Sequence, residues 1–262
     1  MLNNKYRAHI HADVADAVRA AAHEWVVLAA QAIAARGGFH VALSGGTTPR
    51  ALYECLASAE FSAQIDWPRV HIWFGDERAV PPQHPDSNYR MAHDALLCHV
   101  PVLPAHIHRM QGEQDNVHDA ATAYQAQLAA CLSLSGSRPD PMQITGVPQF
   151  DLMLLGLGPD GHVASLFPET PILTERTRWV AAVFVEKLNA WRISLTLPVI
   201  NNARYIMVLV AGAGKAEIVG EIFSARTKTS GRYPVEMIHS DAIMNWYLDA
   251  AAAQYITEKD PS

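Results

Sequence analysis

The chain has 262 residues, of which 50% are hydrophobic and 18% are charged, a composition typical of a globular protein and not of a disordered one. Twenty Lys and Arg against 26 Asp and Glu give a net charge of −6. This balance excludes a global basic field, so we expect no nucleic-acid partner, and a small anionic ligand would need a local cluster of donors.

The ends and cysteines of the chain predict its compartment. The N-terminus has no apolar h-region before a cleavage site, and no apolar run reaches the roughly 18 residues that a membrane span needs. Cys55, Cys98 and Cys131 lie far apart without a CxxC pair, and we interpret them as reduced core thiols, not as metal ligands or disulfide partners. We expect a soluble cytoplasmic protein with no membrane partner.

Helical and strand-like patterns alternate along the chain. Apolar residues at three- and four-residue steps predict a helix over 13–36 that ends at Gly37 and Gly38. A strand is predicted over 39–46, and the next helix opens at Thr48 and Pro49, with Thr48 as a cap, and runs to about Ala57. Later candidates are strands at 70–76, 150–158, 178–186 and 204–212, and helices at 87–97, 214–225 and 240–253.

The strands read as continuous apolar runs between helices. This pattern predicts an α/β fold with a mainly parallel sheet that is covered on both faces. The segment 133–149 has three prolines and two glycines and resembles a linker. Because strands and helices continue to alternate on both sides, we interpret it as a surface loop within a single domain that spans residues 1–262.

The first candidate binding motif is LSGGTTPR, residues 43–50. It follows a strand and precedes a helix, so backbone N–H groups can converge at a helix N-terminus, where an anion is favoured. Ser44, Thr47 and Thr48 add hydroxyl donors. The P-loop pattern GxxxxGK[ST] is absent, which argues against nucleoside triphosphate hydrolysis. The alternative is an ordinary strand-to-helix turn.

The second motif is FGDERAVPPQHPDSNYR, residues 74–90. Asp76, Glu77 and Arg78 follow a strand, and ligands of open α/β sheets bind at the carboxyl ends of the strands. We therefore expect these charges to serve a site and not the core, with a solvated turn as the alternative. Ser87 is predicted to cap the helix that follows.

The third motif is DLMLLGLGPDGHVASLFP, residues 151–168. Its GxGxxG spacing suggests a dinucleotide site, which needs an acidic residue at the end of the next strand, about 20 positions later. Glu175 lies 19 positions after Gly156 but precedes that strand, and Asp160 would place a negative charge where a pyrophosphate binds. The sequence therefore disfavours dinucleotide binding.

Asp160 and His162 suggest acid–base chemistry instead. A histidine near its ordinary pKa can take a proton from water, and a carboxylate can fix its tautomer and raise its basicity. A lone DxH is a weak signal in a chain with 13 histidines. The others have no metal-ligand spacing, so we expect no metal site. Lys187, Arg192 and Lys215 are candidate phosphate ligands, or solubilising surface charges.

Four segments together resemble the 6-phosphogluconolactonase family, in the order in which the family has them. They are LSGGTTPR, FGDERAVPPQHPDSNYRMAHDALL, DLMLLGLGPDGHVASLFP and RISLTLPVINNARYIMVLVAGAGKA, and they span residues 43–216. The resemblance implies hydrolysis of 6-phospho-D-glucono-1,5-lactone to 6-phospho-D-gluconate in the oxidative pentose phosphate pathway, on a Rossmann-like three-layer α/β/α fold without a cofactor. Where many members have KPPxxR, this chain has KLNAWR, which keeps the spacing from Lys187 to Arg192 but loses the prolines.

The resemblance also implies roles for individual residues. His162 resembles the general base, Asp160 the residue that orients it, and Arg78 an arginine that contacts the oxyanion or the phosphate. The remaining residues implied for substrate and phosphate binding are Ser44, Gly45, Gly46, Thr47, Lys187 and Arg192. The expected partner is a small phosphosugar lactone, and the chain is expected to be a monomer or a small homo-oligomer.

Two other functions stay open for such a sequence. Glucosamine-6-phosphate deaminase has a similar glycine-rich motif, but its AFNEP ending is replaced here by ASLFP, and its MDEY by GDER. A non-catalytic sugar-phosphate sensor would share the fold, yet the chain shows no helix-turn-helix extension and has both Asp160 and His162. These differences from the deaminase and from the sensor favour the lactonase.

Overall fold

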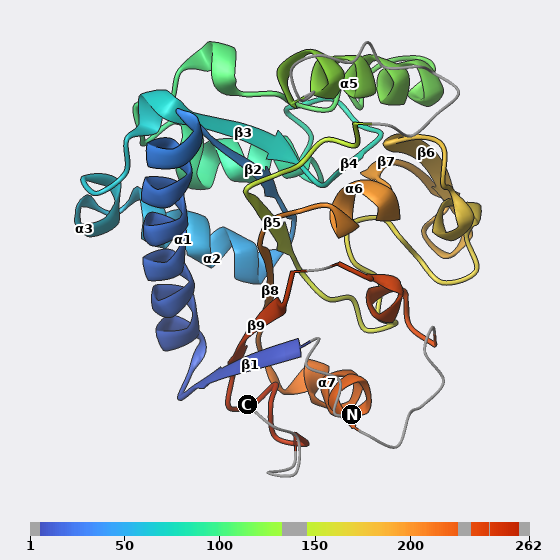
Figure 1. Cartoon of the computed structure of the whole chain (residues 1–262). Helices are drawn as coiled ribbons and strands as arrows, with labels where there is room; N and C mark the ends of the chain where they lie inside the picture. The colour runs from blue at the N-terminus through green and yellow to red at the C-terminus, as the bar shows by residue number, and fades with distance from the viewer. Residues whose placement is uncertain (1–5, 133–145, 225–231, 241, 257–262) are drawn as a thin grey trace.

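The structure is a computed structural model that describes residues 6–132, 146–224, 232–240 and 242–256. Its centre is a sheet of six strands in which all neighbours run parallel, so the predicted α/β fold with a parallel central sheet is confirmed (Figure 1). In spatial order the strands are β1 (Tyr6–His11), β9 (Met244–Asp249), β8 (Ile206–Val210), β5 (Leu152–Leu155), β2 (Phe39–Leu43) and β3 (Val70–Phe74).

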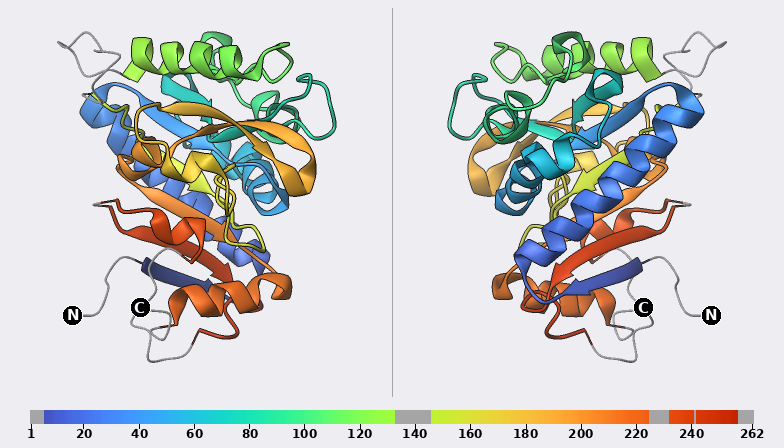
Figure 2. Two further views of the ribbon diagram at one scale, coloured as in Figure 1. Left: turned by 90° about the vertical axis from the view of Figure 1, so that its right-hand side faces the viewer. Right: turned by 90° about the vertical axis from the view of Figure 1, so that its left-hand side faces the viewer.

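Two apolar cores lie on opposite faces of this sheet and make the fold three-layered. Alternate residues of β2 show the division, because Val41 and Leu43 pack with Trp25, whereas Ala42 packs with Trp73. The first face is covered by α1 (Val14–Arg36), α2 (Thr47–Ala57) and α3 (Ala59–Ser62). The second is covered by α5 (Val117–Leu132), α6 (Leu197–Asn201), α7 (Ala216–Phe223) and a smaller sheet (Figure 2).

The helix ends follow from local sequence. α1 begins where Asp13 accepts a hydrogen bond from the backbone N–H of Asp16 at 2.9 Å, and it ends at Gly37, whose φ of 82° is left-handed. α4 (Asn88–Ala92) begins where Ser87 Oγ accepts from the backbone N–H of Arg90 at 3.2 Å, and one π-helical turn, His93–Leu97, continues it. The predicted ends of the first helix and the predicted Ser87 cap are confirmed.

The smaller sheet is antiparallel and was not predicted. It consists of β4 (Asp76–Arg78), β7 (Ala190–Leu195) and β6 (Val180–Val185), and α5 packs against β6 and β7. The strand expected at 178–186 therefore exists, but it lies outside the parallel sheet. This second sheet brings β4, directly after β3, against a segment more than 100 residues later in the chain.

The helix predicted over 240–253 is wrong, because Met244–Asp249 form β9. All six of its residues are buried, and it pairs in parallel with both β1 and β8. A strand inside a sheet that is covered on both faces needs apolar residues on both sides, and the six buried positions, with Trp246 and Tyr247 among them, meet that need. The apolar pattern here was therefore that of a buried strand.

Three further expectations concern residues away from the sheet. All three cysteines are free, but only Cys55 is partly buried; Cys98 and Cys131 are exposed, so their predicted core location is wrong. No helix among the described residues is long and apolar enough to cross a membrane. Residues 133–145 lie outside the described part, so the surface loop and the single domain stay predictions.

Candidate active site

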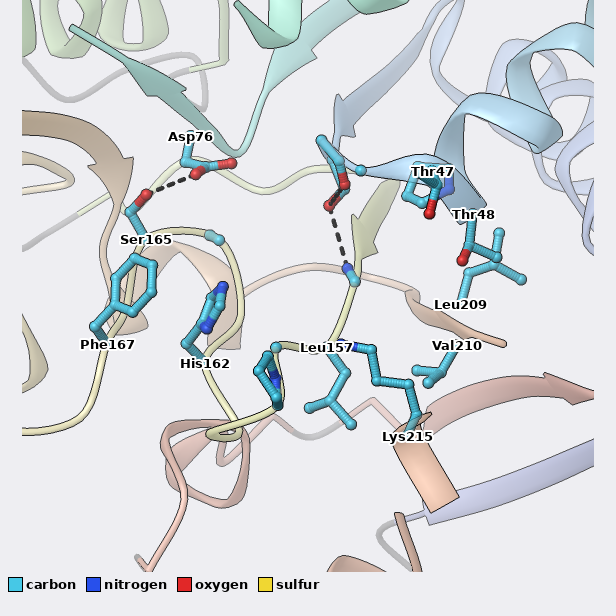
Figure 3. A pocket seen from close by; sticks show the side chains of 18 of the residues that line it. Thr47, Thr48, Asp76, Leu157, His162, Ser165, Phe167, Leu209, Val210 and Lys215 are labelled. Atoms are coloured by element: carbon cyan, nitrogen blue, oxygen red, sulfur yellow. Dashed lines mark hydrogen bonds between the residues drawn. The ribbon is translucent and has the colours of Figure 1, made fainter. Parts of the chain in front are cut away.

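A pocket of about 440 Å³ opens at the carboxyl ends of β2, β5 and β8 (Figure 3). This edge of an open parallel sheet is where ligands bind in such folds. Nearly all of the predicted site residues line the pocket, namely Ser44, Gly45, Gly46, Thr47, Arg78, His162, Lys187 and Arg192. The ninth, Asp160, touches two of them.

The turn between β2 and α2 forms one side of the pocket. The N-cap of α2 is Gly46, with φ of 109°, and α2 begins at Thr47 without a side-chain cap, so the prediction that Thr48 caps this helix is wrong. Both threonines line the pocket. A helix N-terminus without a side-chain cap leaves backbone N–H groups for an anion, as the phosphate-binding prediction requires.

Ser44 and Gly45 join this turn to its neighbours. Ser44 Oγ accepts a hydrogen bond from the backbone N–H of Gly156 at 3.2 Å, which connects the segments after β2 and β5. A Cβ on Gly45 would lie 2.0 Å from Oδ1 of Asn88, so only glycine fits against the start of α4. The two residues therefore hold the pocket wall together.

The loop after β5 places Asp160 against His162. Oδ1 of the carboxylate lies 2.5 Å from Nδ1 of the imidazole. This contact favours the tautomer with its proton on Nδ1, which leaves Nε2 as the nitrogen that can accept a proton. The ring also stacks on Phe167, with 4.0 Å between ring centroids.

The glycines of this loop serve its geometry. A Cβ on Gly158 would lie 1.9 Å from Nδ1 of His162, so the imidazole occupies the space that any other residue would fill. Gly161 has a left-handed φ of 76° and lies against Tyr233. The GxGxxG spacing thus positions a histidine, consistent with the prediction that it is not a dinucleotide fingerprint.

Burial and charge set the protonation states of this pair. Burial is the largest influence on the pKa of His162 and lowers it, while Asp160 and Asp76 act in the opposite direction. Burial would raise the pKa of Asp160, but hydrogen bonds from Lys187 and His162 outweigh it and hold that pKa at about 2. At neutral pH the pair is therefore a neutral imidazole beside a carboxylate.

Lys187 lies in the short turn between β6 and β7 and pairs with Asp160 through Nζ and Oδ2. Its Nζ is also 4.6 Å from the ring centroid of Phe167. The altered KLNAWR segment thus places Lys187 at the pocket, where its observed partner is the carboxylate that holds His162. Its predicted phosphate role stays a prediction.

Arg78 and Arg192 are register partners on β4 and β7. Burial and then the nearby Arg78 lower the pKa of Arg192. Arg78 donates to the backbone carbonyl of Asp86. Like charges directly opposite one another on adjacent strands are unfavourable, so this pairing is typical of a site where an anion binds.

Glu77 does not serve the pocket, contrary to the expectation for this motif. It is 2% exposed and accepts hydrogen bonds from the backbone N–H groups of Arg78, Asn88 and Tyr89. It therefore holds the start of α4. It also accepts a hydrogen bond from Oγ of the Ser87 cap at 3.0 Å.

Three further residues line the pocket: Asp76 and Lys215, which the sequence marked as candidates, and Ser165, which it did not. Asp76 and Ser165 line the pocket and share a 2.6 Å hydrogen bond, and Lys215 lines it from the segment after β8. Ser165 follows His162 by three residues, but nothing in a lone serine marks it as part of a site. No group of three or more His, Cys, Asp or Glu side chains in the described residues is arranged to hold a metal ion.

Comparison with known proteins supports the family resemblance that the four sequence motifs indicate. Residues 12–246 match a family model described as glucosamine-6-phosphate isomerases/6-phosphogluconolactonase. The chain is 40% identical over 224 residues to 6-phosphogluconolactonase of Synechocystis sp., covering 86% of this chain and 87% of that relative. It is 37% identical over 252 residues to 6-phosphogluconolactonase of Streptomyces coelicolor, covering 94% and 93%.

Solved structures give the same picture. The 6-phosphogluconolactonase from Trypanosoma cruzi superimposes with a TM-score of 0.83 at 28% identity, over 98% of each chain. A monomeric glucosamine-6-phosphate deaminase has a TM-score of 0.76 at 17% identity, covering 95% of this chain and 99% of that one. The second similarity is one of fold alone.

Proposed function

The chain belongs to the 6-phosphogluconolactonase family, and on that premise we propose that this pocket hydrolyses 6-phospho-D-glucono-1,5-lactone to 6-phospho-D-gluconate. The observation that carries the proposal is the His162–Asp160 pair, in which a neutral imidazole lies in a pocket that is also lined by cationic side chains. Ester hydrolysis needs a base for water, a cation for the oxyanion and, for this substrate, a phosphate site.

The reaction begins at His162. Asp160 occupies Nδ1, so Nε2 takes a proton from a water molecule as that water attacks the lactone carbonyl. Negative charge develops on the carbonyl oxygen, and Arg78 provides a positive partner for it. The protonated imidazole then donates its proton to the ring oxygen as the carbon–oxygen bond breaks, which opens the lactone and restores neutral His162.

The phosphate is proposed to bind on the side of the pocket away from His162. In Figure 3, Thr47, Thr48 and Lys215 lie across the pocket from His162 and Phe167. Threonine hydroxyls, the backbone N–H groups of a helix N-terminus and a lysine together suit a phosphate dianion. Arg192 lies beside Arg78 and can serve the phosphate or the carboxylate that hydrolysis produces.

One assay tests the proposal. The purified protein should form 6-phosphogluconate from freshly prepared lactone well above the spontaneous rate, which is measured at each pH and subtracted. It should release no ammonia from glucosamine 6-phosphate. Binding of the lactone without turnover would support the sensor instead, and ammonia release at a comparable rate would support the deaminase.

Cofactor, assembly and location remain predictions. Lactone hydrolysis by the residues above requires no cofactor, so full activity is expected in the presence of a chelator. A monomer or small homo-oligomer is expected. The predicted cytoplasmic location must be tested directly, because a rice relative that is 37% identical over 232 residues is named a probable chloroplastic 6-phosphogluconolactonase.

A further inference from the structure

Asp76 is a carboxylate in the pocket that the proposed hydrolysis does not use. It is the first residue of β4, is 7% exposed, and lines the pocket on the same side as His162 (Figure 3). Its charge is close enough to act on the imidazole. A buried carboxylate is costly to maintain, so its partners and its unfilled hydrogen-bonding capacity are informative.

The partners of Asp76 are neutral. Oδ2 accepts from Ser165 Oγ at 2.6 Å, and Oδ1 accepts from the amide Nδ2 of Asn88 at 3.1 Å. None of the ion pairs between described residues includes Asp76, although four cationic side chains line the same pocket. Its charge is therefore held in place by hydrogen bonds and is not neutralised by a direct contact.

Further contacts fix the direction of this carboxylate. Ser194, the register partner of Asp76 on β7, accepts a hydrogen bond from the backbone N–H of Ser165 at 3.2 Å. Asn88 in turn donates to the backbone carbonyl of Asp76 at 2.9 Å and packs against Gly45. Three separate segments thus orient the carboxylate at the pocket wall, as a ligand-binding group requires.

A carboxylate has about four acceptor sites, of which two are filled here. The two unfilled acceptor sites of Asp76 can each accept a hydrogen bond from a ligand in the pocket. The negative charge of the carboxylate repels a phosphate. A phosphosugar lactone offers donors only through its ring hydroxyls. Asp76 lies on the His162 side of the pocket, so a substrate with its carbonyl carbon at His162 and its phosphate at the far side would turn the hydroxyl on the adjacent carbon toward this carboxylate.

We propose that Asp76, held by Ser165 and Asn88, is a specificity-determining residue that accepts a hydrogen bond from the ring hydroxyl next to the lactone carbonyl. The inference rests on the proposed lactonase function. This contact would fix the direction in which the substrate binds, with an acceptor at the hydroxylated end and cations at the phosphate. The substrate class is then a phosphorylated aldonolactone that bears a free 2-hydroxyl group.

The test compares two lactones in the parent protein and in three variants. Blank-corrected kcat/KM is measured for 6-phosphogluconolactone and its 2-deoxy analogue, with the parent protein and with Asp76→Asn. The parent should prefer the hydroxylated lactone by about 10- to 100-fold, the usual effect of a hydrogen bond to a charged group, and Asp76→Asn should reduce this preference to a few-fold. Ser165→Ala, which frees the carboxylate, should reduce it partly and serves if Asp76→Asn does not fold.

The matched control is Asp151→Asn. Asp151 is a buried carboxylate that lies outside the pocket and pairs with Arg36. The preference of this variant between the two lactones should equal that of the parent. The inference is overturned if the parent does not prefer the hydroxylated lactone, or if the preference is as large as the parent's in folded Asp76→Asn or Ser165→Ala. Failure of the parent to hydrolyse either lactone above the blank would instead contradict the proposed function.

Discussion

The imidazole of His162 is subject to two opposing influences on its pKa. Burial lowers the pKa, and the carboxylate of Asp160 raises it, with burial the larger influence. A lowered pKa keeps the base neutral, and thus competent, over more of the pH range, while Asp160 limits the loss of basicity that burial causes. The imidazole of His162 is therefore present in its neutral form and still keeps part of its basicity.

Replacing Asp160 with Asn should separate these two effects. Without the negative charge the pKa of His162 falls further, so the acid limb of kcat/KM should move to lower pH. The plateau should fall by about 10- to 100-fold, because the base is weaker and less well oriented. A blank-corrected pH–rate profile measures both, and a limb that stays in place or moves to higher pH would contradict this account.

Substitution of Gly158 should reduce the rate of hydrolysis as strongly as substitution of a charged site residue. A methyl group in Gly158→Ala would lie 1.9 Å from Nδ1 of His162 and must displace the ring. Displacement of a catalytic group by about 1 Å can reduce the rate by about 10²-fold. Gly214→Ala is the control, because nothing lies within 4 Å of its added Cβ. Near-parental kcat in folded Gly158→Ala would show that the ring position is unimportant.

At the scale of elements, the pairing of β4 with β7 brings two arginines together. Arg192→Ala should raise KM for the lactone by about tenfold or more, because a charge-assisted contact with an anion is lost, whereas Arg78→Ala should lower kcat more. Arg19→Ala, which removes an exposed ion pair with Glu60, should change neither. Parental KM in the Arg192 variant would remove that residue from the site.

The segment after β8 depends on the end of β9. Both carboxylate oxygens of Asp249 lie 3.0 Å from the backbone N–H of Gly212, and Oδ1 also accepts from Ala252 at 2.8 Å. Asp249→Asn should raise KM several-fold by loosening the segment that carries Lys215, and should cost about 1–3 kcal/mol of stability. Kinetics with the phosphorylated lactone measure the change in KM, and a urea titration measures the loss of stability. A loss of kcat at unchanged KM would show that this segment does not bind the phosphate.

How far the sequence predicted these elements depended on how local their causes are. The end of α1 at Gly37, the Ser87 cap and the apolar run of β5 are encoded within a few residues, and all were predicted. β9 and the antiparallel sheet depend on partners far away in the chain. The sequence 244–249 becomes a strand because β1 and β8 lie on either side of it, which periodicity does not reveal.

The same distinction holds for the site. Motifs after β2 and β5 predicted pocket residues such as Ser44, Thr47 and His162, because parallel strands gather their carboxyl ends there. Lys187 and Arg192 come from the antiparallel sheet, and their place at the site was implied by the family resemblance. Asp76 and Ser165 are 89 positions apart, and their hydrogen bond exists only once β4 pairs with β7. Their partnership could not be predicted from either motif alone.

At the scale of the whole molecule, a group of stacked histidines links stability to pH. His71 stacks on His40 and His106, and the ring of His108 stacks on Trp73. Burial lowers the pKa values, to about 3 for His40 and about 4 for His71 and His108. The unfolded chain, with ordinary histidine pKa values near 6.5, then binds protons before the folded protein does.

The free energy of unfolding should therefore fall as pH decreases from about 6.5 toward 4, and His40, His71 and His108 should contribute no pH dependence above that range. Between pH 7 and pH 5 each of these three half-buried histidines should contribute a loss on the order of 1 kcal/mol. Urea titrations of the parent and of His71→Gln measure the difference. The variant should show a shallower decline, and an identical decline would exclude the stacked histidines as its cause.

The central claim is that His162 is the general base of lactone hydrolysis, and the pH–rate profile of His162→Ala tests it most directly. Rates of 6-phosphogluconate formation, corrected for spontaneous hydrolysis at each pH, should be about 10²- to 10⁴-fold below the parent, without the parent's rise through the pKa of His162. Circular dichroism confirms that the variant is folded. Activity within a few-fold of the parent, with the same pH dependence, would contradict the claim.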